Sequence, residues 1–441
     1  MKLARTAVLT VVCGLFLTHS PKAQEKGRFA VNPIPAPGNE TFPDPFPILD
    51  PSNPANRNKV GNDFVFFSTQ DKAMSFPSFD FRSPSDVTVR PISVDVSFLQ
   101  QRLNPAFRIA GSFWAKNVFY DQRTCAWHMI ASAVVAETDW QSKARSGMNI
   151  WPKRLQTSIV HLSPDYTACS TPLAALNQIR YWRVDKELIG RIPTISDTAG
   201  TIVFDYANYA GKLVQDRVGD PIYLIYVKRL GSTMAGIVAQ PMLSPDTVDT
   251  SRPPITLLAP DLRRSSEYRD GASGLQIIET ANVVKIRQTW ALLYTTGNYR
   301  SDTYKIGIAY SDRLTGPYEK VLARDLDNVW RNYPGGASGD EVVYLLQGQN
   351  PNWFNFIRHV KAPGVPTILM ETISGHDQYF MTFAGYPQWM EPRGDQQYNP
   401  AARVAYFAPV SVNIPNSASA VASSGSYDRA HWVELQTQPL R

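Results

Sequence analysis

"GLQIIETANVVKIRQTWALLYTTGNY" occupies Gly274–Tyr299 and contains one carboxylate, Glu279, in front of what the pattern predicts to be a buried β-hairpin. The residues around Glu279 are mostly apolar, so they offer little that would stabilise an ionised side chain. The stretch therefore raises two questions. One is how this hairpin packs with the rest of the chain, and the other is what an acid does among apolar neighbours.

Segments of the same kind recur along the whole chain. They are short, rich in Tyr, Phe, Val and Ile, and bounded by Gly, Pro, Asn or Asp, which is typical of β-strands. They cover residues 62–69, 126–135, 201–207, 221–229, 289–296, 304–311, 341–348, 367–374, 379–385 and 403–412. The best helical candidate is short, at Pro172–Trp182. Many strands without intervening helices predict a sandwich, a barrel or a propeller.

The length of 441 residues exceeds what one compact core usually supports. A sandwich would have to be duplicated, whereas the blades of a propeller pack on one another in a single ring. No short sequence period is visible, so a regular repeat of the WD type is not expected. Residues 24–43 are expected to wrap the surface, and 413–430 form a loop-rich tail.

The N-terminus has the pattern of a signal peptide. Lys2 and Arg5 precede an apolar run at Ala7–Thr18, and Ala23 offers a cleavage site, so residues 1–23 are expected to be removed. We therefore expect a secreted, extracellular and monomeric protein without a membrane span. The net charge is +6, and removing Lys2, Arg5 and Lys22 leaves about +3, with no basic cluster for nucleic acid.

Two cysteines, Cys125 and Cys169, remain after the predicted cleavage, because Cys13 lies in the signal segment. In an oxidising compartment they can form one disulfide, and two free buried thiols are the alternative. Asn39-Glu40-Thr41 is a glycosylation sequon.

The candidates for chemistry are carboxylates. The sequence lacks the motifs of serine hydrolases, zinc proteases, phosphate loops and Cys-x-x-Cys sites, and its six histidines have no ligand spacing. Asp44 stands in "FPDPFPILD", Asp205 follows "GTIVF", and Glu279 opens the hairpin. Such acids could meet on the axis of a propeller. Each also has an ordinary explanation, because Asp-Pro starts turns and strand-edge acids accept hydrogen bonds.

The segment Gly274–Val321 resembles the family 43 glycoside hydrolases. In that family a Glu before a strand pair is the general acid, and "YKIGIAYSDRLTGPYEK" (Tyr304–Lys320) resembles the second strand and its Gly-Pro-Tyr turn. "FPDPFPI" resembles the first-blade element that carries the general base, and Phe113–Ser132 resembles a second-blade element. The resemblance implies a single five-bladed β-propeller over residues 24–441, with Asp44 as base and Glu279 as acid.

The sequence departs from the family pattern in three places. Ala281 replaces a proline, and Lys116 replaces the proline of Trp-Ala-Pro. The third-blade Asp that tunes the acid aligns with Val203 unless it has moved to Asp205. We assign it to Asp205, with Asp216 and Asp220 as fallbacks.

The resemblance implies inverting hydrolysis of arabinose- or xylose-containing plant polysaccharides or oligosaccharides. The acid must stay protonated, so it needs apolar surroundings and a nearby negative charge, while the base activates water. Aromatic side chains beside the motifs, with one arginine, are the predicted carbohydrate-binding residues: Phe46, Trp114, Tyr299, Tyr304 and Arg403. No cofactor is expected, although the resemblance leaves room for a structural calcium ion on the axis. His376 is the candidate for the histidine that the family has near the axis.

Two alternatives stay open. The same propeller could be a catalytically silent carbohydrate-binding or surface-interaction protein, since the tuning Asp is not cleanly present. It could also be a hydrolase or phosphorylase of a related propeller family that acts on fructosides or mannosides.

Overall fold

A computed structural model describes most of the chain between residues 31 and 436. The described residues are 31–37, 40–81, 83–139, 155–166, 176, 179–197, 207–261, 267, 276–322, 342–347, 360–373, 375–392, 397–417, 421, 424, 429 and 431–436. Within them, no helix is long and apolar enough to cross a membrane.

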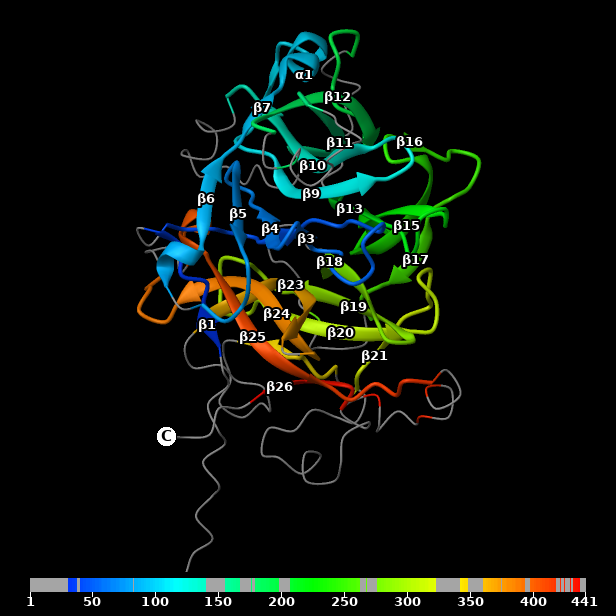
Figure 1. Ribbon diagram of the computed structural model, residues 1–441. Coiled ribbons are helices and arrows are strands. Elements are labelled where there is room, and N and C mark those ends of the chain that lie inside the picture. The colour runs from blue at the N-terminus through cyan, green and yellow to red at the C-terminus, as the bar shows by residue number, and fades with distance from the viewer. Residues whose placement is uncertain are drawn as a thin grey trace, which may run out of the picture.

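The strands form five blades around a common axis, and the pairing within them is mostly antiparallel (Figure 1). Blade 1 contains β2 (Phe46–Pro47), β3 (Lys59–Val60), β4 (Asp63–Phe67), β5 (Lys72–Phe76) and β6 (Thr88–Pro91). Blade 2 contains β7 (Ser93–Asp95), β8 (Phe107–Ile109), β9 (Trp114–Asp121), β10 (Ala126–Glu137), β11 (Leu155–Pro164) and β12 (Tyr181–Ile189), with the short helix α1 (Ser97–Arg102). Blade 3 contains β13 (Tyr209–Val214), β14 (Ile222–Arg229), β15 (Met234–Ser244), β16 (Thr247–Val248) and β17 (Ile255–Leu258).

The last two blades complete the ring. Blade 4 contains β18 (Gln276–Ile286), β19 (Thr289–Thr296), β20 (Lys305–Ser311), β21 (Glu319–Lys320) and β22 (Leu346–Gln347). Blade 5 contains β23 (Val360–Ile373), β24 (His376–Pro387), β25 (Val404–Val412), β26 (Val433–Leu435) and, from the other end of the chain, β1 (Asn32–Pro33). The expected all-β five-bladed β-propeller is therefore confirmed.

The innermost strands are β2, β9, β13, β18 and β23. They pack against one another around the axis, β13 between β9 and β18, and β2 between β9 and β23. Two parallel residue pairs also join β15 of blade 3 to β18 of blade 4. Because the side chains of these inner strands reach the axis, they determine what lies there.

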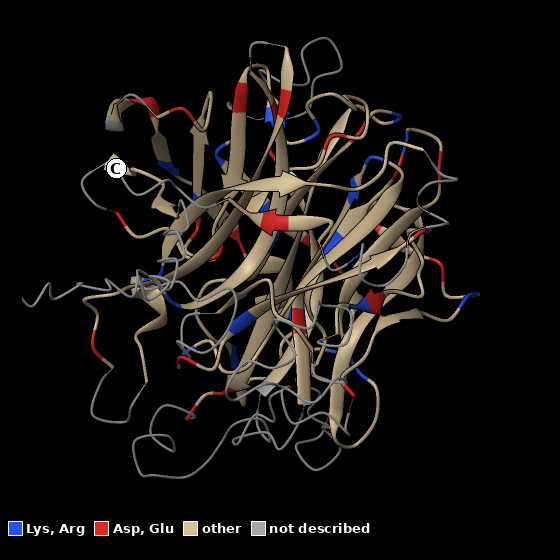
Figure 2. Ribbon diagram, turned by 90° about the horizontal axis from the view of Figure 1, so that it is seen from below, with Lys and Arg blue, Asp and Glu red and all other residues tan. Residues whose placement is uncertain are grey.

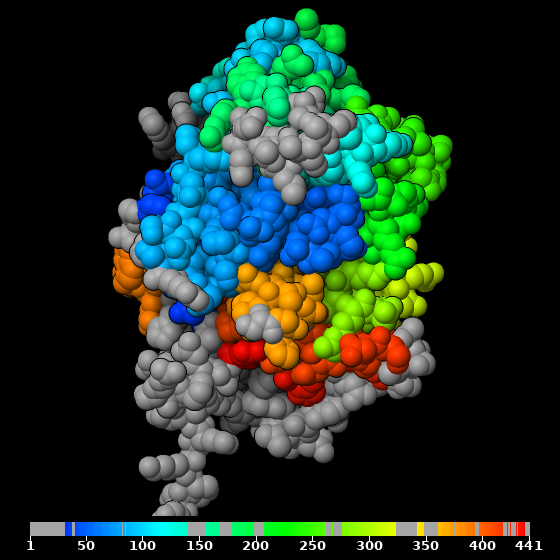
Figure 3. Space-filling view, in the orientation of Figure 1, coloured from blue at the N-terminus to red at the C-terminus, as the bar shows by residue number. Residues whose placement is uncertain are grey.

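The N-terminal segment closes the ring. Asn32 pairs with Phe407 and Pro33 with Tyr406, so β1 adds a strand to the blade built from the end of the chain (Figure 1). The space-filling view shows the first blade in blue directly against the fifth in orange (Figure 3). Phenylalanines fill this junction, and the rings of Phe79 and Phe380 stack with centroids 4.5 Å apart. The closure thus combines backbone hydrogen bonds with a buried aromatic cluster.

A kink repeats at the same place in every blade. Asp44, Ala115, Ala210, Thr280 and Val365, here called the kink residues, have φ of 58°, 53°, 56°, 51° and 57°. Non-glycine residues rarely adopt this conformation, which costs on the order of 1–3 kcal/mol each. Its recurrence in all five blades indicates that the kink belongs to the architecture, where it turns the start of each inner strand toward the axis.

The strand pairing shows the same repeat in four of the blades. The register shifts across the kink, as in a β-bulge, and the residues that flank the shift are Trp114 and Asn117, Tyr209 and Lys212, Glu279 and Asn282, and Gly364 and Thr367. The kink, together with the register shift where it occurs, allows the five blades to be aligned with one another by their backbone geometry. Residues just before or at the kinks lie at one mouth of the axis, and residues two positions after them lie deeper.

Most of the strands predicted from the sequence are present, and β19 has the predicted bounds, Thr289–Thr296. The helix predicted over Pro172–Trp182 is wrong at its end, because Tyr181 and Trp182 belong to β12. Trp182 is buried against Phe67 of blade 1, so packing between blades outweighs helix propensity there. In the stretch predicted at 341–348, only Leu346–Gln347 forms a described strand.

Acidic and basic residues are interspersed over the blades (Figure 2). Several form ion pairs between blades, as Lys186 on β12 and Asp246 in the β15–β16 turn do at 2.7 Å. Cys125 is disulfide-bonded, whereas Cys169 and Asn39 of the sequon lie outside the described residues.

Candidate active site

A cavity of about 310 Å³ opens at the mouth of the axis where the kinks lie. In four of the five blades, a polar or aromatic side chain at the kink, or one residue before it, lines this cavity. The lining includes Asp44 of blade 1, Trp114 of blade 2, Tyr209 of blade 3 and Glu279 of blade 4. Phe46, Tyr299, Tyr304 and Arg403 also line it, so every predicted site residue that the structure describes faces this one cavity.

Glu279 stands on β18 immediately before the kink, deep in the cavity wall. Two tyrosine hydroxyls donate hydrogen bonds to its carboxylate, from Tyr209 to Oε2 at 2.6 Å and from Tyr304 to Oε1 at 2.8 Å. Burial raises the pKa of Glu279, these two hydrogen bonds lower it in part, and the nearby Asp44 carboxylate raises it. The net direction is upward, as an acid that must hold its proton requires.

A chain of hydroxyls extends from Glu279 into blade 4. The Thr295 hydroxyl lies 2.8 Å from the Tyr304 hydroxyl and also contacts the Thr280 hydroxyl. Burial and the neighbouring Glu279 raise the pKa of Tyr304 well above its usual value, so this phenol stays protonated. Because hydroxyls both donate and accept, the chain can reorient when Glu279 gains or loses its proton.

Asp44 is held on the opposite side of the mouth by a buried arginine. Arg403 Nη1 lies 2.6 Å from Asp44 Oδ1, and the Thr69 hydroxyl donates to Oδ2 at 3.1 Å. Arg403 is only 2% exposed, and its guanidinium lies between the rings of Tyr304 and Tyr386, at 5.5 and 5.9 Å. Arg403 therefore orients the predicted base, in addition to lining the cavity as predicted.

A glycine allows Tyr304 to reach Glu279. A Cβ on Gly364 of blade 5 would lie 1.9 Å from Cε1 of Tyr304, so the ring occupies the space that any other side chain would need. Phe46 and Tyr304 are almost fully buried, whereas Trp114 and Tyr299 are partly exposed to the cavity. The exposed pair is the part of the predicted aromatic wall that is accessible to a ligand.

The sequence matches no protein-family model and no curated protein. Solved structures do match its fold. A thermostable family-43 glycoside hydrolase matches with a TM-score of 0.53 and 15% identity over 93% of this chain and 97% of the other. The α-L-arabinofuranosidase from Lactobacillus brevis has a TM-score of 0.53 and 14% identity over 86% of this chain and 93% of its own.

This chain has the family 43 glycoside hydrolase fold. The xylan β-1,4-xylosidase from Bacillus halodurans C-125 also matches, with a TM-score of 0.51 and 14% identity over 91% of this chain. The match covers 56% of that enzyme, so the present chain spans about half of its length.

The kink in blade 3 is Ala210, at the position that corresponds to Asp44 in blade 1, so no carboxylate stands at this kink. Val203 and Asp205 both lie outside the described residues, so the assignment of the tuning role to Asp205 stays a prediction.

The two fallback residues lie elsewhere in the family 43 fold. Asp216 is at the far end of β13, where Lys285 and Arg57 pair with it at 2.5 and 3.6 Å. Asp220 sits in an exposed turn, where it accepts a hydrogen bond from the Arg217 backbone at 3.1 Å. Neither lines the cavity that contains Glu279, so neither can tune it by contact.

The axis of this family 43 fold does not suit calcium. Among the described residues no three His, Cys, Asp or Glu side chains gather around a common point, and a lysine, Lys212, stands on the axis below the cavity. Calcium needs six to eight oxygen ligands, several of them carboxylates, and an ammonium group repels it. His376 lies exposed at the β23–β24 hairpin and lines neither cavity on the axis, so it is not a histidine near the axis.

Sequence reasoning missed Tyr209, Thr69 and Lys212. Tyr209 precedes the kink in blade 3 just as Glu279 precedes it in blade 4, a correspondence that only the repeated register shift reveals. Tyr304 was predicted as part of the sugar-binding wall, whereas in the structure its hydroxyl holds the acid. The sequence signal that could have identified these residues is weak. The five kink residues share a backbone conformation, but no residue type is common to all of them.

Proposed function

We propose that this protein is a secreted, monomeric glycoside hydrolase that cleaves arabinose- or xylose-containing polysaccharides or oligosaccharides with inversion. The observation that carries the proposal is the difference between its two carboxyl groups in one cavity. Glu279 is buried with a raised pKa, and Asp44 is ion-paired with Arg403. Two carboxyl groups with such opposed environments are the arrangement that acid–base glycoside hydrolysis needs.

In this mechanism the protonated Glu279 gives its proton to the leaving oxygen as the glycosidic bond breaks. Asp44 takes a proton from a water molecule that attacks the opposite face of the sugar carbon, which inverts its configuration. Trp114 and Tyr299 offer ring faces for the sugar. Afterwards Glu279 is ionised, and the hydroxyls of Tyr209 and Tyr304 stabilise its charge until it regains a proton.

Two of the proteins with matching folds, an α-L-arabinofuranosidase and a xylan β-1,4-xylosidase, support the substrate class. The signal-like N-terminus supports secretion. The apolar lining with a few convergent polar groups is typical of a small-molecule site.

A catalytically silent carbohydrate-binding protein is the second candidate, and Ala210 is the observation that favours it. The kink in blade 3, which corresponds to Asp44 in blade 1, carries a methyl group and no carboxylate. The two tyrosine hydroxyls on Glu279 favour its charged form, which works against an acid, although burial and Asp44 raise the pKa of Glu279 overall.

One experiment separates the two candidates. The purified protein is assayed on 4-nitrophenyl α-L-arabinofuranoside, 4-nitrophenyl β-D-xyloside and linear arabinan, and the anomer released first is identified by proton NMR. Hydrolysis with the inverted anomer supports the proposal, whereas the retained anomer contradicts the mechanism. Binding of arabino- or xylo-oligosaccharides by calorimetry without any hydrolysis would support the silent protein.

Replacing Tyr304 by Phe should shift the pH profile of an active enzyme. The Tyr304 hydrogen bond lowers the pKa of Glu279, so its loss raises that pKa further and keeps the acid protonated to higher pH. We expect the alkaline limb of kcat/KM to move to higher pH, and kcat to fall by about tenfold because the ionised product form loses a hydrogen bond.

The matched control is Tyr310→Phe, on β20, which begins directly after Tyr304. Tyr310 packs against Trp432, away from the cavity, so its pH profile should equal that of the unmodified protein. An unchanged alkaline limb in Tyr304→Phe would contradict the role assigned to that hydroxyl.

A further inference from the structure

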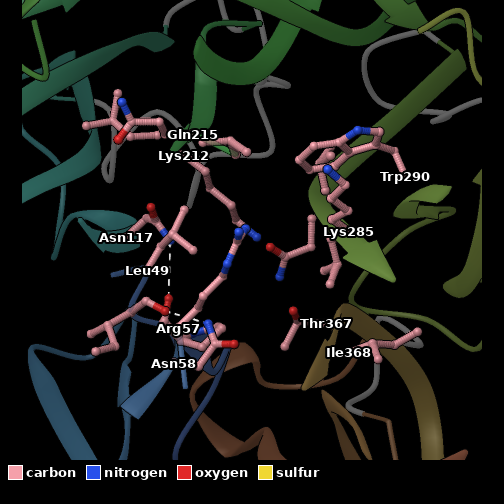
Figure 4. A pocket seen from close by; sticks show the side chains of 17 residues that line it. Leu49, Arg57, Asn58, Asn117, Lys212, Gln215, Lys285, Trp290, Thr367 and Ile368 are labelled. Atoms are coloured by element: carbon pink, nitrogen blue, oxygen red, sulfur yellow. Dashed lines mark hydrogen bonds between the residues drawn. The ribbon is translucent and has the colours of Figure 1, made fainter. Parts of the chain in front are cut away.

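A second cavity, of about 70 Å³, lies on the axis below the candidate active site (Figure 4). Its walls come from the residues two positions after the kinks, Asn117, Lys212, Asn282 and Thr367. Phe46 of blade 1 separates the two cavities, because its ring lines the upper one and lies 4.9 Å from the Lys212 ammonium. The lower cavity is thus a distinct compartment.

Lys212 is the unusual member of this lining. It is 2% exposed, and among the described residues no hydrogen-bond acceptor lies within reach of its Nζ. Figure 4 shows its side chain extending into the cavity from blade 3, while Arg57 extends into it from blade 1. A buried ammonium without an acceptor is costly, so its environment is incomplete without a ligand.

The charges around the cavity are unbalanced. Three cationic side chains line it, those of Arg57, Lys212 and Lys285, and the carboxylate beside them is Asp216. Asp216 already pairs with Lys285 at 2.5 Å and with Arg57 at 3.6 Å, which leaves Lys212 without a counter-charge in the described part of the chain. Burial lowers the pKa of Lys212 to about 7, which reflects this missing partner.

The amide oxygens of the cavity make no hydrogen bond to Lys212 Nζ, and that of Asn117 is itself buried without a partner among the described residues. The Nδ2 groups of Asn58, Asn117 and Asn282 donate to the backbone carbonyls of Ile48, Pro47 and Pro366, at 2.6, 3.4 and 3.1 Å. They are therefore fixed by the inner strands. An ion in the cavity would meet cationic groups first, and this excludes a metal cation and favours an anion.

We propose that this axial cavity binds a small monovalent inorganic anion, such as chloride, between Lys212 and Arg57. Its size suits a halide or a few water molecules, since one water needs roughly 10–15 Å³ of such space. Entry is from the side opposite to the active site, where Arg57, Asp216 and Lys285 are each about a quarter exposed, at 23%, 22% and 26%. The anion neutralises Lys212 and keeps its ammonium charged beneath Phe46.

Bromide replaces chloride and gives an anomalous diffraction signal, so crystals of the protein grown in sodium bromide test the site directly. We expect an anomalous peak in the cavity in contact with Lys212 Nζ. Density for water alone, without an anomalous peak, would overturn the proposal.

Thermal unfolding tests the site in solution. The melting temperature is measured in sodium chloride and in sodium gluconate at equal ionic strength, because gluconate is too large for the cavity. We expect a rise of about 2 °C in chloride when its concentration is about ten times the Kd. Equal melting temperatures in the two salts would contradict the proposal.

The variant Lys212→Met should abolish the difference between chloride and gluconate. Lys228→Met on β14 of the same blade is the matched control and should retain it, because Lys228 is not part of the cavity. If Lys212→Met does not fold, the bromide crystals of the unmodified protein still decide the question. A chloride effect that persists in folded Lys212→Met would place the anion elsewhere.

Discussion

Replacing Glu279 by Gln and Asp44 by Asn should each reduce kcat/KM on arabinan or a xylo-oligosaccharide by about 10³-fold, because each removes one of the two proton transfers. Both replacements keep the shape of the side chain. A glutamine at position 279 can still accept one tyrosine hydroxyl and donate to the other, so the folded structure should persist.

The two variants should differ in their dependence on the leaving group. A 2,4-dinitrophenyl glycoside needs no proton on departure, so Glu279→Gln should recover most of its activity on that substrate. Asp44→Asn should not recover, because water activation is still required. Asp220→Asn, in an exposed turn, is the control and should retain full activity. Recovery of Asp44→Asn and not of Glu279→Gln would reverse the two assignments, and full activity in both would refute them.

Replacing Arg403 by Met should have the second largest effect. The methionine fills much of the space between Tyr304 and Tyr386 but leaves Asp44 without its ion-pair partner at 2.6 Å. We expect kcat/KM to fall by about 10²-fold. The free energy of unfolding should fall by about 2–4 kcal/mol, because removing one partner leaves a partly buried carboxylate uncompensated.

Arg429→Met is the matched control. Arg429 also pairs with a carboxylate, Glu319 at 2.6 Å, and also lies over an aromatic ring, that of Trp432. It is more exposed, with a third of its side chain accessible, so its loss should cost about 0.5 kcal/mol or less and leave activity unchanged. Urea unfolding and kinetics on the same preparations measure both effects. Equal losses in the two variants would contradict a special role for Arg403.

Features that depend on residues close together in the sequence could be predicted, whereas features that depend on residues far apart in the sequence could not. Individual strands such as Thr289–Thr296 follow from local patterns of aromatic and β-branched residues. Glu279 and Asp44 could be selected because each stands beside a motif that resembles the family 43 hydrolases. These two residues line one cavity only because the five blades close into a ring, and no local sequence pattern specifies that closure.

The residues that support the site could not be predicted in the same way. Tyr209 and Arg403 reach Glu279 and Asp44 from other blades, across large separations in the sequence. Ala210 could be matched with Asp44 only through the kink that they share. Because this backbone conformation accepts Asp, Ala, Thr and Val alike, the residue types alone do not reveal which positions of the blades correspond.

The pairing of Asn32 with Phe407 has a consequence for biogenesis. β1, which completes blade 5, is synthesised long before its partner β25, because the other four blades lie between them in the sequence. The nascent chain therefore carries an unsatisfied strand and exposed phenylalanines while those blades are made, and the circle can close only after β25 has emerged.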